Sequence, residues 1–482
     1  MLFNSIDFAI FLPVVFAIYW SLGKRYKIQN FFILVASYVF YGWWDSRFLL
    51  LLVFSTLVDF FVGLALSNEF RPASRKILLF ISLITNLGLL CIYKYLNFFI
   101  DTFTDAFQLF GSEINIEKIA LILPVGISFY TFQTMSYTID VYSKKLIPTK
   151  DAVAFAAYVT FFPQLVAGPI ERATNLLPQF CKPRTFDYKE AVDGSRQIIW
   201  GLFKKMVIAD NCAVLSDMFF DHHELYPGGS LLLGAFFFSF QIYCDFSGYS
   251  DIAIGISRLF GFSLIKNFAF PYFSRDIAEF WRRWHISLSG WFKDYVYIPL
   301  GGNAGKINIQ IRNTFIVFLI SGFWHGAKWT FVVWGFFHAL LFIPTFIFTK
   351  KTNNMNIVAH EQSFPSIKEF FQMLYTFGSV LLLWIFFRSE NLDTAMQILA
   401  KIFSSSFFEL NITEQKGQAV MTVLFILFLI IIEWFGRRRQ FAIENILSAY
   451  STCWRWGFYA FLISLIGMYM QTSGSPFIYF QF

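Results

Sequence analysis

Long apolar stretches, separated by short polar ones, run along the whole chain. A helix needs roughly 20 residues to cross the hydrocarbon core of a bilayer. Stretches near that length lie at residues 6–22, 30–44, 48–66, 77–93, 119–141, 196–220, 231–255, 313–325, 329–349, 368–388, 418–435 and 456–470. The pattern predicts an all-α polytopic membrane protein, with a single membrane domain over residues 1–482 and about ten to twelve transmembrane helices.

The composition supports a membrane protein and argues against a nucleic-acid-binding one. Hydrophobic residues make up 57% of the 482 positions and charged residues only 14%, with a mean hydropathy of +0.56. Soluble domains average about 25% charged residues. The net charge of +7 comes largely from short loops and not from a compact basic domain, so the chain is not expected to bind nucleic acid.

The basic loops predict how the chain is threaded through the membrane. Lys24, Arg25 and Lys27 directly follow the first apolar stretch, and basic loops tend to stay on the cytoplasmic side. Further basic loops lie at residues 71–76, 144–145, 350–351 and 437–439. With about twelve crossings, all of these loops fall inside, so both termini are expected to face outward.

Residues 152–170 depart from a simple spanning helix. They contain Pro163, Gly168 and Pro169, which would break a membrane helix, and basic residues flank both ends. Irregular backbone at membrane depth is tolerated only where it is buried in protein or lines a wet cavity. We expect this re-entrant segment to enter and leave on the cytoplasmic side, next to a functional interior.

Residues 275–293 predict an amphipathic helix, lying in the interface or against the cytoplasmic side of the protein. At about 100° per residue, one apolar stripe holds Ile277, Trp281, Trp284, Leu288 and Trp291. The opposite face holds Arg275, Asp276, Glu279, Arg282 and Arg283. His285 falls toward the apolar stripe with Ser289 beside it, so its ring is expected to face the buried side.

Two histidines, His325 and His285, are the candidate catalytic residues. His325 lies in an almost wholly apolar run, and an ionisable group at membrane depth is costly and is kept for a reason. Burial favours the neutral imidazole, which can act as a general base toward a hydroxyl. The alternative for His325 is a core histidine that joins two helices, since Gly322 and Gly326 have the spacing of close helix packing. For His285 the alternative is an interfacial histidine bonded to a neighbouring carbonyl.

The stretch at residues 240–256 is unusually polar for a membrane span. Asp245, Tyr249 and Asp251 lie in it, and two acids in one span need partners, a watery cavity or protons. They line a substrate path or bond neighbouring helices, and the sequence leaves both alternatives open. No converging metal ligands, CxxC pair or nucleotide-binding loop is evident, so neither a metal site nor an ATP-driven pump is expected.

Several stretches, in order along nearly the whole chain, carry a family resemblance. They are Met1-Leu-Phe-Asn-Ser, Pro163-Gln-Leu-Val-Ala-Gly-Pro-Ile-Glu-Arg, Tyr243-Cys-Asp-Phe-Ser-Gly-Tyr-Ser-Asp, Phe280-Trp-Arg-Arg-Trp-His-Ile-Ser-Leu-Ser, Tyr297-Ile-Pro-Leu-Gly-Gly-Asn and Phe323-Trp-His-Gly. Together they resemble the membrane-bound O-acyltransferase superfamily, and within it the bacterial branch that O-acetylates alginate, peptidoglycan and other polysaccharides. One departure is Ala339, where relatives often have glycine.

The resemblance implies a ring of tilted helices around a tunnel, with an acyl donor arriving from the cytoplasm and an acceptor from outside. His325 matches the family's near-invariant histidine, and His285 matches its second polar position. By this resemblance His325 would deprotonate an acceptor hydroxyl, which attacks an acetyl thioester. His285 would orient a substrate or stabilise the oxyanion. Acetyl-CoA, or another acyl thioester, would be the co-substrate, with no bound cofactor.

Less specific candidates for substrate binding complete the expected site. Arg282, Arg283 and Lys293 would lie near the cytoplasmic mouth, where cations meet the phosphates of the donor. The remaining candidates are Asp245, Tyr249 and Ser289.

The resemblance also implies a location, partners and alternatives. The chain would lie in the bacterial cytoplasmic (inner) membrane, serve a polysaccharide acceptor, and work with a periplasmic or surface SGNH-type acetyltransferase. One alternative is transfer of D-alanyl or another acyl group from a carrier protein. Another, from a different class, is a proton-coupled transporter or flippase of lipid-linked sugars that uses Asp245, Asp251 and the histidines as a relay.

Overall fold

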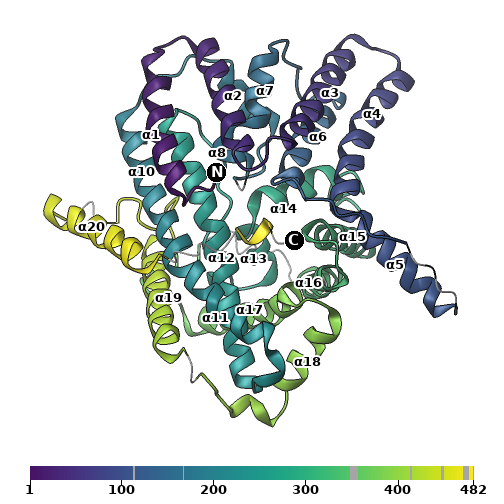
Figure 1. The fold of residues 1–482 in the computed structure, drawn as a ribbon. Helices are drawn as coiled ribbons and strands as arrows, with labels where there is room; N and C mark the ends of the chain where they lie inside the picture. Colours follow the sequence, from purple (N-terminus) through teal and green to yellow (C-terminus); the bar gives the residue numbers. More distant parts are fainter. Residues whose placement is uncertain are drawn as a thin grey trace. The chain divides into compact units, whose positions relative to one another are not determined.

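The computed structural model describes residues 1–111, 114, 116–166, 168–347, 357–412, 415–446, 450–470 and 477–480. Within them the regular secondary structure is helical throughout, which confirms the predicted all-α class (Figure 1). The predicted basic loop at residues 350–351 lies outside them. The chain divides into two compact units, residues 1–191 with 256–265 and residues 192–255 with 266–482. The single domain predicted for the chain stays a prediction.

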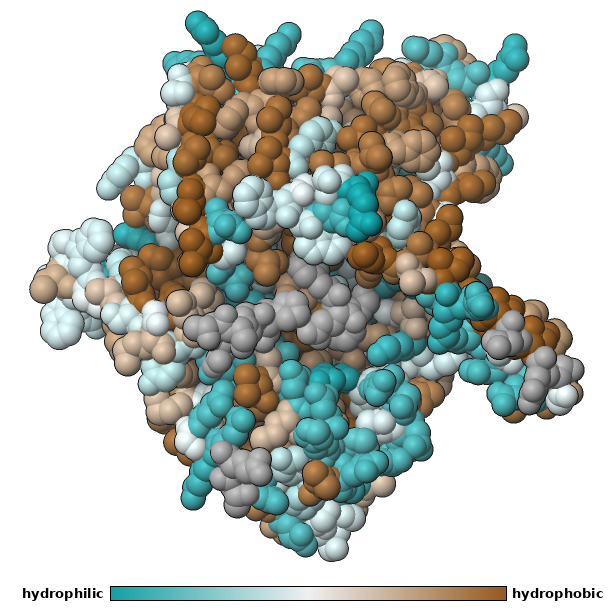
Figure 2. Space-filling model, viewed as in Figure 1, coloured by the Kyte–Doolittle hydropathy of each residue, from teal (hydrophilic) through white to brown (hydrophobic). Residues whose placement is uncertain are grey.

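The first unit consists of the N-terminal helices. They are α1 (Ile6–Ser21), α2 (Tyr26–Gly42), α3 (Phe48–Asn68), α4 (Pro72–Leu90), α5 (Leu96–Leu109), α6 (Ile127–Tyr142), α7 (Ala152–Thr160), α8 (Phe162–Leu165), α9 (Ala173–Phe180) and the start of α10 (Tyr188–Leu202). Helices α3 and α4 both pack on α6, and α2 packs on α7. The visible faces of α1, α3 and α4 carry mostly hydrophobic side chains, as expected of helices in lipid (Figure 2).

The second unit carries the polar span and both candidate histidines. Its helices are α11 (Asp210–Asp221), α12 (Gly228–Leu259), α13 (Ile277–Arg283), α14 (Ile286–Phe292), α15 (Ile307–His325), α16 (Trp329–Ile347), α17 (Ile367–Arg388), α18 (Leu392–Ile402), α19 (Lys416–Gly436) and α20 (Thr452–Tyr469). A π-helical segment, Phe203–Ala209, joins α10 to α11. Helix α15 packs along α16, and α16 packs on α17.

Six helical stretches among the described residues are long and apolar enough to cross a membrane. They are α3, the continuous stretch Pro72–Leu109 that contains α4 and α5, α12, α16, α17 and α19. They support a multi-pass membrane protein, whereas the total of about ten to twelve spans stays a prediction. The predicted stretch at residues 119–141 becomes helical only at Ile127, after Gly126 in the left-handed conformation.

Residues 152–170 are broken, as the sequence predicted. Helix α7 ends, Phe161 leaves the helical conformation, and α8 begins with Pro163 in its first turn, where proline is tolerated. The N–H of Phe162, freed at this break, donates to the Ser37 hydroxyl at 3.1 Å. The irregular backbone is therefore buried and partnered within the first unit, as a break at membrane depth requires.

The prediction of one continuous helix over residues 275–293 is wrong. The segment forms two short helices, α13 and α14, separated at His285, whose backbone is left-handed (φ 44°). The apolar stripe is buried as predicted, but Glu279 is buried too. Its carboxylate lies between the guanidinium groups of Arg275 (3.0 Å) and Arg283 (2.8 Å). Because two guanidinium groups replace the water that would otherwise hydrate this carboxylate, Glu279 can be buried.

Close packing against α16 fixes the helix that carries His325. A Cβ added at Gly322 would overlap the Phe331 carbonyl oxygen, and one at Gly335 would overlap the Phe318 carbonyl oxygen. The two glycines therefore let the backbones of α15 and α16 approach each other closely, as the small-residue spacing around Gly322 predicted.

We expect Gly322→Val to lower the thermal unfolding midpoint of the detergent-purified protein. The added side chain must push α15 and α16 apart, and overpacking of this kind costs about 1–3 kcal/mol. Gly378→Val on α17 is the matched control, because a Cβ there meets open space. Equal midpoints for the two variants would contradict the close approach of α15 and α16.

Candidate active site

The structure brings His285 and His325 together in the second unit. His325 is the last residue of α15, and His285 lies between α13 and α14, with the two ring centroids 6.5 Å apart. Only 0% and 2% of their surfaces are exposed. Two imidazoles at this separation can contact the same small group bound between them.

The hydrogen bonds around His285 determine its tautomer. Its Nδ1 lies 3.1 Å from Oδ1 of Asn267, an atom that also accepts the backbone N–H of Ser287 at 3.2 Å. A backbone N–H can only donate, so this Asn267 atom is the carbonyl oxygen, and Nδ1 of His285 carries the proton. Burial lowers the pKa of His285 to about 3. At neutral pH the ring is therefore uncharged, with its lone pair on Nε2.

Aromatic rings surround the two imidazoles. The Trp324 ring lies 6.2 Å from that of His285 and 5.0 Å from that of His325. The rings of Trp334 and Phe387 lie 5.3 Å and 5.4 Å from that of His325. Such surroundings exclude water and lower the local dielectric constant, which strengthens any interaction between an imidazole and a bound hydroxyl or carbonyl.

Tyr479 also belongs to this site, and the sequence analysis missed it. Its ring centroid lies 6.3 Å from that of His285 and 5.7 Å from that of His325. It lies in a short 3-10 segment, Ile478–Phe480, at the far end of the chain from the histidine motifs. A hydroxyl within an apolar aromatic run was the local signal, but such a run does not identify a distant partner.

Asp245 holds the Tyr479 segment in place. Its carboxylate accepts the backbone N–H of Ile478 at 2.8 Å and pairs with Nζ of Lys205 at 2.8 Å. Lys205 also pairs with Asp210 at 2.9 Å, and all three ionic side chains are buried. These partners favour the alternative in which Asp245 bonds neighbouring elements.

Two further polar residues of α12, Tyr249 and Asp251, also contact neighbouring segments. The Tyr249 ring lies 4.5 Å from that of Phe477, and Asp251 pairs with Lys204 at 2.6 Å. The consecutive residues Lys204 and Lys205 lie in the π-helical segment, and both are buried. Across the described parts of the chain, no group of three or more His, Cys, Asp or Glu side chains could hold a metal ion.

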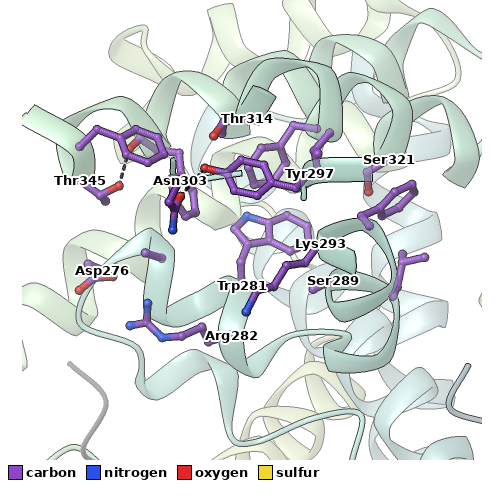
Figure 3. A pocket seen from close by; sticks show the side chains of 17 residues that line it. Asp276, Trp281, Arg282, Ser289, Lys293, Tyr297, Asn303, Thr314, Ser321 and Thr345 are labelled. Atoms are coloured by element: carbon purple, nitrogen blue, oxygen red, sulfur yellow. Dashed lines mark hydrogen bonds between the residues drawn. The ribbon is translucent and has the colours of Figure 1, made fainter. Parts of the chain in front are cut away.

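A cleft of about 500 Å³ opens among α13, α14, α15 and α16 (Figure 3). It is lined by Asp276, Ala278, Trp281, Arg282, Leu288, Ser289, Phe292, Lys293, Tyr297, Asn303, Thr314, Val317, Phe318, Ser321, Phe342, Thr345 and Phe346. Arg282 and Lys293 lie on one side of it in Figure 3, whereas Arg283 is not in the lining and pairs with Glu279. A largely apolar cleft that holds two cations and one acid, Asp276, suits an anionic ligand that carries a narrow chain.

Neither His285 nor His325 lines this cleft, but Trp281, which does line it, packs toward the histidine pair. Its ring lies 5.7 Å from that of Trp334, which in turn lies 5.3 Å from that of His325. The Trp281 indole N–H donates to Nδ1 of His338 at 3.3 Å, a bond that favours a structural role for His338. Helix α15 contributes to both the cleft and the histidine pair, since Ser321 lines the cleft one turn before His325.

Comparisons with known proteins give one family-model match and several relatives. Residues 143–387, which include both histidines, match the model of the membrane-bound O-acyltransferase family. The chain is 38% identical over 446 residues to the probable alginate O-acetylase AlgI of Pseudomonas aeruginosa (91% of this chain, 82% of that protein). It is 37% identical over 429 residues to the peptidoglycan O-acetyltransferase of Helicobacter pylori (83% and 79%). It is 28% identical over 234 residues to the teichoic acid D-alanyltransferase of Bacillus subtilis (46% and 58%).

We expect Lys205→Met to lower the thermal unfolding midpoint strongly. The variant leaves the carboxylates of Asp245 and Asp210 buried without their cation, and breaking a buried pair in this way costs about 3–5 kcal/mol. Lys189→Met, at an exposed position, is the control and should unfold like the wild type. A wild-type midpoint for Lys205→Met would show that this lysine does not hold the two acids.

Proposed function

The chain belongs to the membrane-bound O-acyltransferase family and is therefore an O-acyltransferase, and from this premise we propose that it acetylates an exported or cell-wall polysaccharide. In this proposal acetyl comes from a thioester on the cytoplasmic side, acetyl-CoA in the first instance, and passes through the membrane. The alginate and peptidoglycan O-acetylating relatives support acetyl as the acyl group, since they match far more of the chain than the D-alanyl-transferring relative does.

The pairing of two buried, closely spaced histidines carries this proposal. His325 takes the proton from an acceptor hydroxyl, whose oxygen forms a bond to the acetyl carbonyl carbon. The carbon–sulfur bond of the thioester breaks, and the proton held by His325 passes to the departing thiolate. His285, with its proton on Nδ1, offers a lone pair on Nε2, so it is suited to accept a hydrogen bond and orient a hydroxyl.

The cleft is the proposed binding place of the donor. A coenzyme or carrier thioester joins phosphates to a narrow chain that ends in the acyl group. Arg282 and Lys293 would meet the phosphates, while Ser289 and the apolar walls would contact the chain. Arg283 is less suited to this role, because its guanidinium is paired with Glu279 at 2.8 Å. Asp245 and Tyr249 would contribute indirectly, because they contact the segment that carries Tyr479 and hold it in position.

The proposed function also includes a membrane location and partner molecules. We place it in the bacterial inner membrane with both termini outside, in line with the basic loops. The acceptor hydroxyl would belong to the polymer itself or to a periplasmic or surface SGNH-type acetyltransferase that hands acetyl on. The alternative of a transporter is set aside, because the chain belongs to an acyltransferase family.

We expect His325→Ala to reduce acetyl transfer by about 10²–10⁴-fold, the usual contribution of a general base. The measurement is release of free thiol from acetyl-CoA by purified protein with its partner and acceptor present. His222→Ala, at an exposed position, is the matched control. Wild-type release by His325→Ala would exclude the base role, and no release by folded wild type would point to a carrier-protein donor.

We expect Tyr479→Phe to lower transfer at least about tenfold, because it removes the hydroxyl of a ring that packs beside both imidazoles while keeping the ring itself. The same thiol-release assay measures the effect. Tyr450→Phe, at a position that is 60% exposed, should behave like the wild type. An unchanged rate in Tyr479→Phe would mean that only the packing of this ring matters.

A further inference from the structure

Asn267 hydrogen-bonds both the His285 ring and the residues directly after it. Its backbone carbonyl accepts the N–H of Ile286 at 2.9 Å, and its side-chain oxygen accepts the N–H of Ser287 at 3.2 Å. The same oxygen accepts the Ser287 hydroxyl at 2.9 Å and Nδ1–H of His285 at 3.1 Å. The Asn267 amide nitrogen donates to the Ser250 hydroxyl at 3.3 Å, and the side chain is wholly buried. One asparagine therefore holds both the ring and the backbone that follows it.

The backbone at His285 needs such support. Its φ of 44° and ψ of 55° are left-handed, a conformation that is unfavourable for a residue with a Cβ. Strained residues of this kind persist where the surroundings fix them, and they cluster at functional sites. Asn267 fixes this one by accepting the first two N–H groups after the turn, which α14 itself cannot satisfy.

The partner of the imidazole is a neutral amide and not an acid. Among the described residues, the titratable groups whose rings face that of His285 from other elements include His325 on α15 and Tyr479 in the C-terminal segment. The other rings against it are those of Phe246, Phe268 and Trp324. A carboxylate in the place of the amide would stabilise the charged imidazolium. The amide fixes which nitrogen holds the proton and leaves the ring neutral.

We propose that Asn267 is a positioning residue of the acyl-transfer site, which keeps His285 in the Nδ1–H tautomer so that Nε2 can accept a hydrogen bond from a substrate hydroxyl. The proposal rests on the proposed function, because it gives His285 a part in transfer. It adds a residue from a different segment, the loop after α12, to the two histidines. The oxygen of Asn267 acts only through His285 and touches no substrate.

The Asn267→Asp variant tests whether the partner of the His285 ring must be uncharged. It keeps the size and the acceptor oxygen of Asn267 but places a negative charge about 3 Å from the imidazole, the distance at which an opposite charge shifts a pKa by about 1–3 units. The pKa of His285 rises, and the neutral ring is lost as the pH falls through this higher value. We expect the loss of thiol release on acidification to begin about 1–3 pH units higher than in the wild type.

The matched control is Asn30→Asp in the first unit. Asn30 is also buried, and its amide binds Arg184 and the Phe180 carbonyl, with no histidine among these partners. Its pH profile should match that of the wild type. An unshifted profile in Asn267→Asp, or an equal shift in both variants, would overturn the proposal.

A readout independent of activity separates this proposal from the proposed function. The chain has six histidines, so histidine-selective ¹⁵N labelling gives few signals, and His285→Gln identifies the one sought. We expect Nδ1–H in the wild type and loss of that single tautomer in Asn267→Leu, with Asn267→Ala as a second variant if the first does not fold. A wild-type Nε2–H tautomer, or an unchanged one in the variant, would overturn the role of Asn267.

The two proposals fail in different ways. If the tautomer depends on Asn267 but His285→Gln transfers acetyl at the wild-type rate, then the role of His285 in transfer is wrong, and Asn267 serves structure alone. If His285→Gln loses transfer but the tautomer does not depend on Asn267, the histidine site stands and the positioning role fails.

Discussion

A dry interior is the constraint on which the candidate site depends. Moving a polar or charged group out of water is unfavourable unless protein partners replace the lost hydration. Three buried ions of the second unit are paired, with Lys205 between Asp245 and Asp210. The buried imidazole of His285 instead stays neutral and takes a neutral partner. The same dryness therefore produces ion pairs at one place and an uncharged imidazole at another.

These two responses to burial meet at the candidate site. The Asp245 carboxylate uses one oxygen for Lys205 and the other for the Ile478 backbone, and this places the Tyr479 ring next to both histidines. The ion pair between Asp245 and Lys205 thus helps to bring Tyr479 into the site, although it lies outside the site itself. In a water-poor pocket each fixed dipole acts strongly on a reacting group. The fixed positions of a few polar side chains therefore contribute more to catalysis than a large number of polar residues would.

The features that depend on local pattern were predictable from the sequence. Apolar runs gave the membrane class, and Pro163 gave the break between α7 and α8. A histidine within an apolar run gave His325 as a candidate, and the structure shows it buried. The helical period also gave the buried stripe that includes Trp284. In each case the residue and its near neighbours carry the signal.

Features that depend on contacts between distant segments were not predictable. The break at His285 is stabilised by Asn267 from another loop, and Glu279 is buried because Arg275 and Arg283 both turn to it. Tyr479 reaches the histidines only because the C-terminal segment folds back on Asp245. No periodicity in the single chain specifies such pairings, since each is set by tertiary structure.

The central claim is that thioester and acceptor meet between the two imidazoles. The most direct test is a cryo-EM structure of the protein with a non-hydrolysable acetyl-CoA analogue. The account predicts phosphates beside Arg282 and Lys293 and an acyl carbonyl within about 4 Å of both rings, the reach of a near-attack geometry. An analogue bound away from the cleft, with its acyl group remote from His285 and His325, would contradict it.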